Sequence, residues 1–310
     1  MKMKNLNLKI IKSCSAAMIT LMLGSNCNLC FPLSNGGKTG MDFLKIEAGA
    51  RQVGMGGAFV GIADDIYSPQ WNPAGLSEIK TQEFGFTNIN WITGINYNYL
   101  GYVNPSISST IAIGMSYNQL SFVVQEMDQD VLPLGQEEFS YSNLCFSFSK
   151  KFKQKISAGI NIKVISALVK GYSPQTFLED IGLIYKISKT KRLGISVQNF
   201  GSPMKFINES DPVPLNYKIG MGFFPSDKII FSVELNKSDT TNINAGIEYM
   251  LAKKFILRAG MRSGYDLDGM TFGFGTRLKI KDVDMIRIDY AVAQMGYWGS
   301  VQRISLGTEF

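Results

Sequence analysis

From residue 82 to its last residue, the chain alternates apolar and polar residues in fourteen segments of about ten residues each. In a β-strand this alternation puts one set of side chains on each face, and about ten residues let a tilted strand cross a bilayer. The segments are 82–92, 95–103, 109–118, 139–149, 155–166, 178–187, 192–200, 215–224, 228–236, 241–250, 254–262, 270–280, 284–293 and 301–310. A soluble β-sandwich also alternates. The strand length and the almost uniformly apolar outer sets instead predict an all-β fold, a transmembrane outer-membrane barrel over residues 81–310.

The connections between these segments alternate in length, which predicts an orientation. Short and often lysine-rich turns follow the even segments. Bacterial barrels have short periplasmic turns and longer outer loops, so both ends of the barrel chain are expected in the periplasm. The longer connections follow odd segments and comprise 119–138, 167–177, 201–214, 263–269 and 294–300.

The last segment ends the chain on an aromatic residue. Ile304, Leu306 and Phe310 fall on one face, whereas Arg303 and Ser305 fall on the other. A terminal aromatic on such a strand resembles the signal read by the barrel-assembly machinery. We therefore expect that machinery as a partner during biogenesis, with Phe310 as the assembly signal. Closure of the barrel requires this last strand to pair with the first, because lipid cannot satisfy an open edge.

The N-terminus predicts export. Four lysines precede an apolar stretch, 15–23, that is too short to span a bilayer but suits the core of a signal peptide. We expect a signal peptide over 1–27, with cleavage somewhere between residues 24 and 35, and location in the outer membrane. A lipoprotein signal at Cys27 is disfavoured, because Leu23 stands one position too early and Asn26 is a poor neighbour.

Composition excludes several function classes. The chain has no His, which removes the commonest metal ligand and general base, and a Ser-His-Asp hydrolase with them. Of four Cys residues only Cys145 lies surely in the mature chain, so neither a disulfide framework nor a thiolate metal site is expected. The net charge of +6 is spread without a basic cluster and does not indicate nucleic acid. We predict no enzyme activity, no cofactor and no metal.

Residues 40–80 do not alternate and are dense in glycine, which suggests close backbone packing in a confined space. A dinucleotide-binding site is a more specific interpretation of Gly54 and Gly56 than close packing. Its spacing fails, because Phe59 stands where the third glycine belongs and no strand precedes. The same stretch carries the acidic pair Asp64 and Asp65.

This stretch resembles the N-terminal signature of the PorV/PorQ-type outer-membrane proteins, which belong to the FadL-like barrels. The resemblance rests on the runs 43–51, 54–60, 63–65 and 71–76, and on the C-terminal strand pair 288–310. It implies a barrel of about fourteen strands with a short N-terminal hatch, 40–80, inside the lumen. The residues that match the hatch motif are Gly54, Gly56, Gly57, Asp64, Asp65, Trp71, Asn72, Pro73, Ala74 and Gly75.

The resemblance implies three alternative functions. FadL-like relatives resemble transporters that pass or bind hydrophobic or amphipathic small molecules through a hatch-gated lumen. PorV-like relatives resemble type IX secretion shuttles that bind the C-terminal signals of secreted proteins, with secretion-system proteins as partners. The third alternative is a structural protein with a closed lumen. The expected partners otherwise are outer-membrane lipid and a hydrophobic ligand.

Strand alternation also predicts which charged side chains face the lumen. A salt-bridged lumen that stabilises the hatch is one interpretation, and attraction of an anionic head group by surplus guanidinium groups is the other. Because an unpaired buried carboxylate is strongly disfavoured, we expect Asp64, Asp65 or Glu47 to meet a luminal Arg. The candidate luminal charges are Arg258, Arg262, Arg277, Arg287, Arg303 and Asp289.

Overall fold

The computed structural model describes residues 41–91, 94–108, 110–127, 133–206, 209–252, 254–265, 269–280 and 283–310. The predicted signal peptide, its cleavage region and Cys27 of the alternative lipoprotein signal lie outside the described residues.

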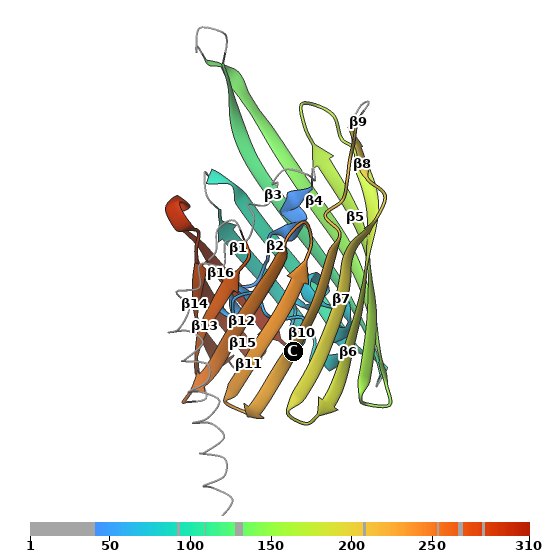
Figure 1. Ribbon diagram of the computed structural model, residues 1–310, viewed down its shortest axis with the longest axis vertical. Helices are drawn as coiled ribbons and strands as arrows, with labels where there is room; N and C mark the ends of the chain where they lie inside the picture. Colours follow the sequence, from blue (N-terminus) through green and yellow to red (C-terminus); the bar gives the residue numbers. More distant parts are fainter. Residues whose placement is uncertain are drawn as a thin grey trace, which may run out of the picture. The chain divides into compact units, whose positions relative to one another are not determined.

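Fourteen antiparallel strands form a closed barrel (Figure 1), as predicted. They follow one another around the wall in chain order, and β1 pairs with β16, Glu83 lying opposite Glu309. This pairing leaves the wall without an edge strand. The strands are β1 Glu83–Asn90, β2 Asn96–Ser108, β3 Ile111–Met127, β4 Pro133–Phe152, β5 Ile156–Leu168, β6 Gln175–Ser188, β7 Lys191–Gly201, β10 Asn216–Ser226, β11 Ile229–Lys237, β12 Thr241–Leu251, β13 Phe255–Ser263, β14 Gly269–Ile280, β15 Val283–Gln294 and β16 Ser300–Glu309.

The two faces of the wall differ as a membrane barrel requires. In β6 exposed and buried residues alternate over eleven consecutive positions. The outward side chains are large and apolar, such as Ile162 at 50% exposure and Phe272 at 49%, whereas inward Asn161 and Thr271 are buried. An apolar outer band of this kind is stable only against lipid.

Two predicted loops contain strand. Residues 119–138 were expected to connect two strands, but β3 and β4 continue through most of this range as a hairpin that projects beyond the barrel (Figure 1). Strict alternation ends there, since Val123 and Val124 are both exposed, and outside the bilayer no uniform face is needed. Within 201–214, β8 Met204–Phe206 pairs with β9 Glu209–Asp211.

Residues 41–80, called the N-terminal segment below, form four short helices and no strand. These are η1 Asp42–Lys45, α2 Ala50–Gly54, α3 Ser68–Trp71 and η2 Pro73–Glu78. Phe59, Ile62, Ile66 and Trp71 are fully buried against inward side chains of the wall. A further helix, η4 Gly296–Trp298, lies between β15 and β16. None of the helices in the described ranges has the length and apolar character to cross a bilayer.

The two ends of the barrel differ in their connections. We call the end that carries the β3–β4 hairpin and the β8–β9 hairpin the long-loop end, and the opposite end the short-turn end (Figure 1). Phe310 follows β16 at the short-turn end, where its N–H group donates to the carbonyl of Gln82 at 3.0 Å. Its side chain is 55% exposed, on the same outward face as Ile304 and Leu306.

Deleting Phe310 should lower the amount of protein assembled in the outer membrane. The side chain is largely exposed on the outward face, so a loss of assembly would reflect a lost signal rather than a lost core interaction. The measurement is heat-modifiable gel migration in membrane fractions, with Leu306→Asp as the matched control on the same face. Normal assembly of the deletion variant would show that Phe310 is not an assembly signal.

Candidate functional site

The N-terminal segment touches the wall at positions where both sides lack side chains. Gly56 has a φ of +69°, and a Cβ atom there would lie 2.6 Å from the carbonyl oxygen of Ala245 in β12. A Cβ atom at Gly260 in β13 would lie 2.0 Å from the backbone nitrogen of Gly56. Backbone therefore packs against backbone, which only glycine permits. Gly54 and Gly57 lie in the same turn, and Gly54 approaches Gly273 of β14.

Side chains fix the rest of the segment to the opposite part of the wall. The amide nitrogen of Asn72 donates to the carbonyls of Leu183 in β6 and Ile195 in β7, while its oxygen accepts from the N–H of Ala74. Pro73 occupies the first turn of η2, where a missing N–H costs nothing. Gly75 lies against the Ala63 carbonyl with no room for a Cβ atom.

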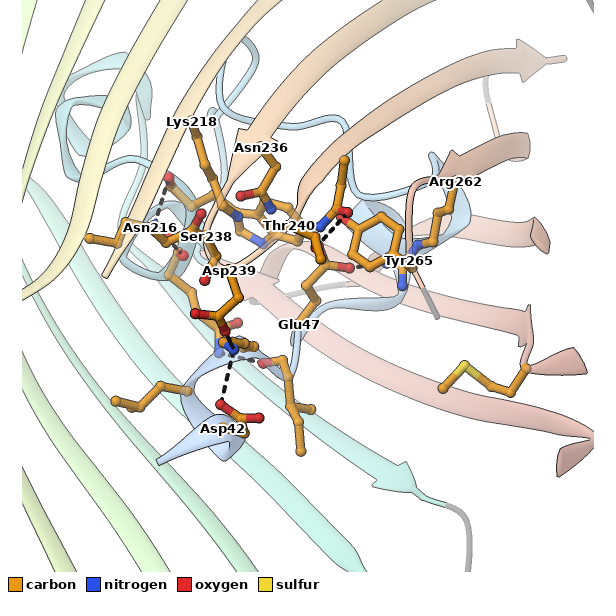
Figure 2. A pocket seen from close by; sticks show the side chains of 18 of the residues that line it. Asp42, Glu47, Asn216, Lys218, Asn236, Ser238, Asp239, Thr240, Arg262 and Tyr265 are labelled. Atoms are coloured by element: carbon orange, nitrogen blue, oxygen red, sulfur yellow. Dashed lines mark hydrogen bonds and ion pairs between the residues drawn. The ribbon is translucent and has the colours of Figure 1, made fainter. Parts of the chain in front are cut away.

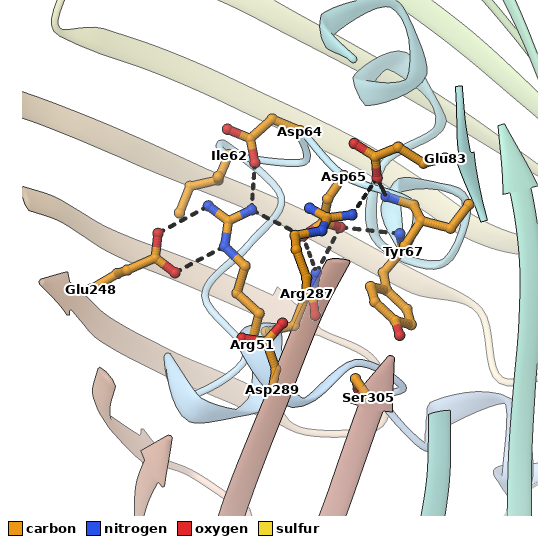
Figure 3. A network of polar contacts seen from close by, with 12 residues as sticks. Arg51, Ile62, Asp64, Asp65, Tyr67, Glu83, Glu248, Arg287, Asp289 and Ser305 are labelled. Atoms are coloured by element: carbon orange, nitrogen blue, oxygen red, sulfur yellow. Dashed lines mark hydrogen bonds and ion pairs between the residues drawn. The ribbon is translucent and has the colours of Figure 1, made fainter. Parts of the chain in front are cut away.

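Arg51 is the centre of a buried charge network (Figure 3). Its guanidinium group bonds to both carboxylate oxygens of Glu248 in β12, at 2.9 and 3.2 Å. It also contacts Asp64 at 2.8 Å and Asp65 at 2.9 Å. Burial disfavours the charged form, but the three carboxylates outweigh it and hold the pKa of Arg51 well above its usual value. The network links two parts of the N-terminal segment to each other and to β12 of the wall.

The wall extends this network on one side. Arg258 bonds to Glu248 at 2.6 Å and to Asp289 at 2.7 Å. Arg287 bonds to Glu83 at 2.5 Å, and the same carboxylate accepts the backbone N–H of Ile66 at 2.8 Å. Ion pairs thus join β12 through β13 to β15, and a separate pair joins β15 to β1. Pairing on this scale satisfies charges that would be strongly unfavourable alone.

The remaining candidate arginines lie in different surroundings. Arg262 forms an ion pair with Glu47. Arg303 is 1% exposed and has no carboxylate within ion-pair distance among the described residues, and its Nη1 atom has no hydrogen-bond partner there. Its Nε donates to the Glu47 carbonyl at 3.2 Å. Arg277 is half-buried, and its Nε likewise has no partner in the described part of the chain.

A cavity of about 310 Å³ lies at the long-loop end, between the N-terminal segment and the wall (Figure 2). Its lining combines apolar groups, including Trp71, Trp91 and Met295, with four cations and three carboxylates. Lys45 pairs with Asp42 and Asp239, and Arg262 pairs with Glu47, which leaves Lys218 and Arg303. Lys218 lies over the ring of Trp71, 4.3 Å from its centroid. Its Nζ is 3.8 Å from the nearest oxygen of Glu234, longer than a charge-assisted hydrogen bond. The cavity therefore offers both apolar surface and incompletely paired positive charge.

The structure thus groups the predicted residues in two places. The expected contact between one of the three acids and a luminal arginine is present, since Glu47 pairs with Arg262. Asp64 and Asp65 bond mainly to Arg51, and Asp64 also lies 3.9 Å from Arg192 of β7. Sequence reasoning missed Arg51. A signal was present, because Arg51 is the only cation between residues 46 and 79, in a stretch that carries four carboxylates.

Comparison with known structures shows the same fold at low sequence identity. The "CymD monoaromatic hydrocarbon channel" gives a TM-score of 0.65 at 13% identity, covering 85% of this chain and 98% of that one. The Ralstonia pickettii toluene transporter TbuX gives 0.60 at 12% identity, with the same coverage. A Pseudomonas aeruginosa FadL homologue gives 0.58 at 10% identity, again with 85% and 98% covered.

Comparison of the sequence alone gives the family. No curated protein matches the chain. The family model described as "Uncharacterised protein family (UPF0164)" matches residues 34–310. Because this match covers most of the chain, the protein belongs to the family UPF0164, and its fold is that of a FadL-like barrel.

Proposed function

We propose that this protein passes hydrophobic or amphipathic small molecules across the outer membrane, and that the N-terminal segment acts as a hatch in their path. The fold is shared with proteins described as hydrocarbon transporters and channels. The segment contacts strands on all sides of the wall, from β2 to β16. A molecule that enters the cavity at the long-loop end therefore meets the segment before it can reach the short-turn end.

The observation that carries the proposal is that Arg303 lines the cavity and that its Nη1 atom has no hydrogen-bond partner among the described residues. A buried guanidinium group without a carboxylate partner is unfavourable, and an incoming anion would satisfy it. The indole of Trp91 lies 5.5 Å from this guanidinium group, next to the apolar lining. An amphiphile with an anionic head and a hydrocarbon tail would match both features. Such binding and passage involve no bond making, so the proposed function is not enzymatic.

Changing Arg303 to Met should weaken binding of hexadecanoate about tenfold, the value of one charge-assisted hydrogen bond. Binding of hexadecanol, which has the same tail and no charge, should change little. The measurement is titration of the purified protein with each ligand. Arg277→Met removes the same group outside the cavity lining and serves as the control. Equal loss for both ligands, or equal hexadecanoate affinity in wild type and Arg303→Met, would contradict the proposed site.

A further inference from the structure

A second cavity, of about 630 Å³, lies on the other side of the N-terminal segment, at the short-turn end. Its ionisable lining is strongly unbalanced, with four cations and one carboxylate. The five groups are Lys80, Lys151, Lys186, Arg192 and Glu78. Three of the cations come from one side of the wall, from β4, β6 and β7, with β5 between the first two.

These cations converge on Glu78, the last residue of η2. Lys151 Nζ is 3.2 Å from one carboxylate oxygen, and Lys186 Nζ is 2.5 Å from the other. Ser157 donates its hydroxyl to the same carboxylate at 2.9 Å. The Glu78 side chain is only 3% exposed, whereas the two lysine side chains are 21% and 27% exposed. The carboxylate therefore lies under the lysines, and the lysines face the open cavity.

Arg192 adds positive charge that Glu78 does not neutralise. Its Nη1 is 3.9 Å from Asp64, at the limit of an ion pair, and Asp64 is already bonded to Arg51 at 2.8 Å. The central carbon of its guanidinium group lies over the Phe224 ring, 4.6 Å from the centroid, and Nη1 donates to the Ile62 carbonyl at 3.4 Å. A cation–π contact of this kind holds the guanidinium group in place without using its N–H donors.

Glu78 is ionised at neutral pH. Burial would raise the pKa of this carboxyl, but the hydrogen bond from Lys186 and the charges of Lys151 and Arg192 outweigh burial and hold the pKa below its usual range. Each lysine ammonium carries three N–H donors and uses one on Glu78, so donors remain for a second oxyanion.

We propose that this cavity is an anion site, distinct from the cavity at the long-loop end, which binds a compact oxyanion such as a phosphate group between Lys151, Lys186 and Arg192. The anion shares the lysines with Glu78, so the two carry like charge and compete. Two sources would supply this chemistry, free phosphate on the periplasmic side or the charged head of a small amphiphile. The site does not depend on transport, because inorganic phosphate tests it alone.

The test is calorimetric titration of the purified full-length chain with inorganic phosphate and, separately, with octyl phosphate. Glu78→Gln removes the competing charge and should bind phosphate about tenfold more tightly. Lys151→Met combined with Lys186→Met should lose at least about tenfold. Lys189→Met, on the exposed β6–β7 turn outside the cavity, should equal wild type.

The outcomes test the site and distinguish its two possible ligands. Phosphate binding in the expected order of variants supports the site with free phosphate as its ligand. Binding of octyl phosphate alone, in the same order of variants, supports the site with an amphiphile head as its ligand. Equal affinity in Glu78→Gln, the double lysine variant and wild type would overturn the proposal. If Glu78→Gln fails to assemble, Lys151→Met and Lys186→Met as single variants carry the same comparison with Lys189→Met.

Discussion

Replacing Arg51 with Met should free the N-terminal segment from the wall while leaving the barrel closed. Arg51 is bonded to Glu248, Asp64 and Asp65, and all four side chains are largely buried. The substitution removes the guanidinium group that these three carboxylates share, and removing one partner of a buried ion pair costs about 3–5 kcal/mol. Glu248 keeps its bond to Arg258. The strands keep their backbone pairing, because no ladder bond involves Arg51.

Two measurements separate these effects. Heat-modifiable migration should stay normal, since it reports the closed wall, whereas protease should now cleave within 41–80. Lys45→Met is the matched control, because Lys45 also bonds to two carboxylates, Asp42 and Asp239, but at a more exposed site. Exposed pairs contribute about 0–1 kcal/mol, so this variant should remain protected. Equal protease resistance of Arg51→Met and wild type would contradict the role given to the network.

The wall could be predicted from the sequence almost residue by residue. The expected strand 241–250 is β12, Thr241–Leu251, and the expected strand 228–236 is β11, Ile229–Lys237. Lipid on one side and polar groups on the other impose period two on every strand that crosses the bilayer. Outside the bilayer the period of two is not required, and there the prediction was wrong. β3 and β4 continue into the range expected to be a loop, without a clean alternation.

The candidate site could be predicted only in part. The alternation predicted that Arg258, Arg287 and Arg303 face inward, and all three side chains are buried. It could not give their partners, because these depend on where a non-periodic segment comes to lie against the wall. Arg303 shows the difference, since nothing in its own strand indicates that it has no carboxylate partner among the described residues, whereas Arg258 has two.

The more specific resemblance, to the PorV/PorQ type, stays a prediction from motifs, and so does the secretion-shuttle function that it implies. The N-terminal motif residues now have a physical role. Gly56 allows backbone contact with the wall, and Asn72 bonds the segment to two strands. These contacts would serve any barrel that must hold a segment in its lumen. The motif by itself therefore does not distinguish a transporter from a shuttle.

Locking the N-terminal segment to the wall should abolish uptake. Ile62 lies against Gly222 of β10, and a Cβ atom at residue 222 would be 3.2 Å from Ile62 Cγ1. Cγ1 is one bond from the Ile62 Cβ atom, so cysteines at the two positions would lie next to each other, and a disulfide needs Cβ atoms about 3.5–4.5 Å apart. The bond would join positions 160 residues apart, one in the N-terminal segment and one in the wall. If the segment must move for a molecule to pass, the locked protein stays closed.

The most direct measurement is therefore uptake of labelled hexadecanoate by cells that carry Ile62→Cys and Gly222→Cys, with the native cysteines replaced by serine, under oxidising and then reducing conditions. Each single-cysteine variant is the control for the substitutions themselves. We expect uptake at the level of cells without the protein when the disulfide is formed, and recovery to the level of the single variants on reduction. Undiminished uptake by fully cross-linked protein would contradict the proposal that the N-terminal segment gates the barrel.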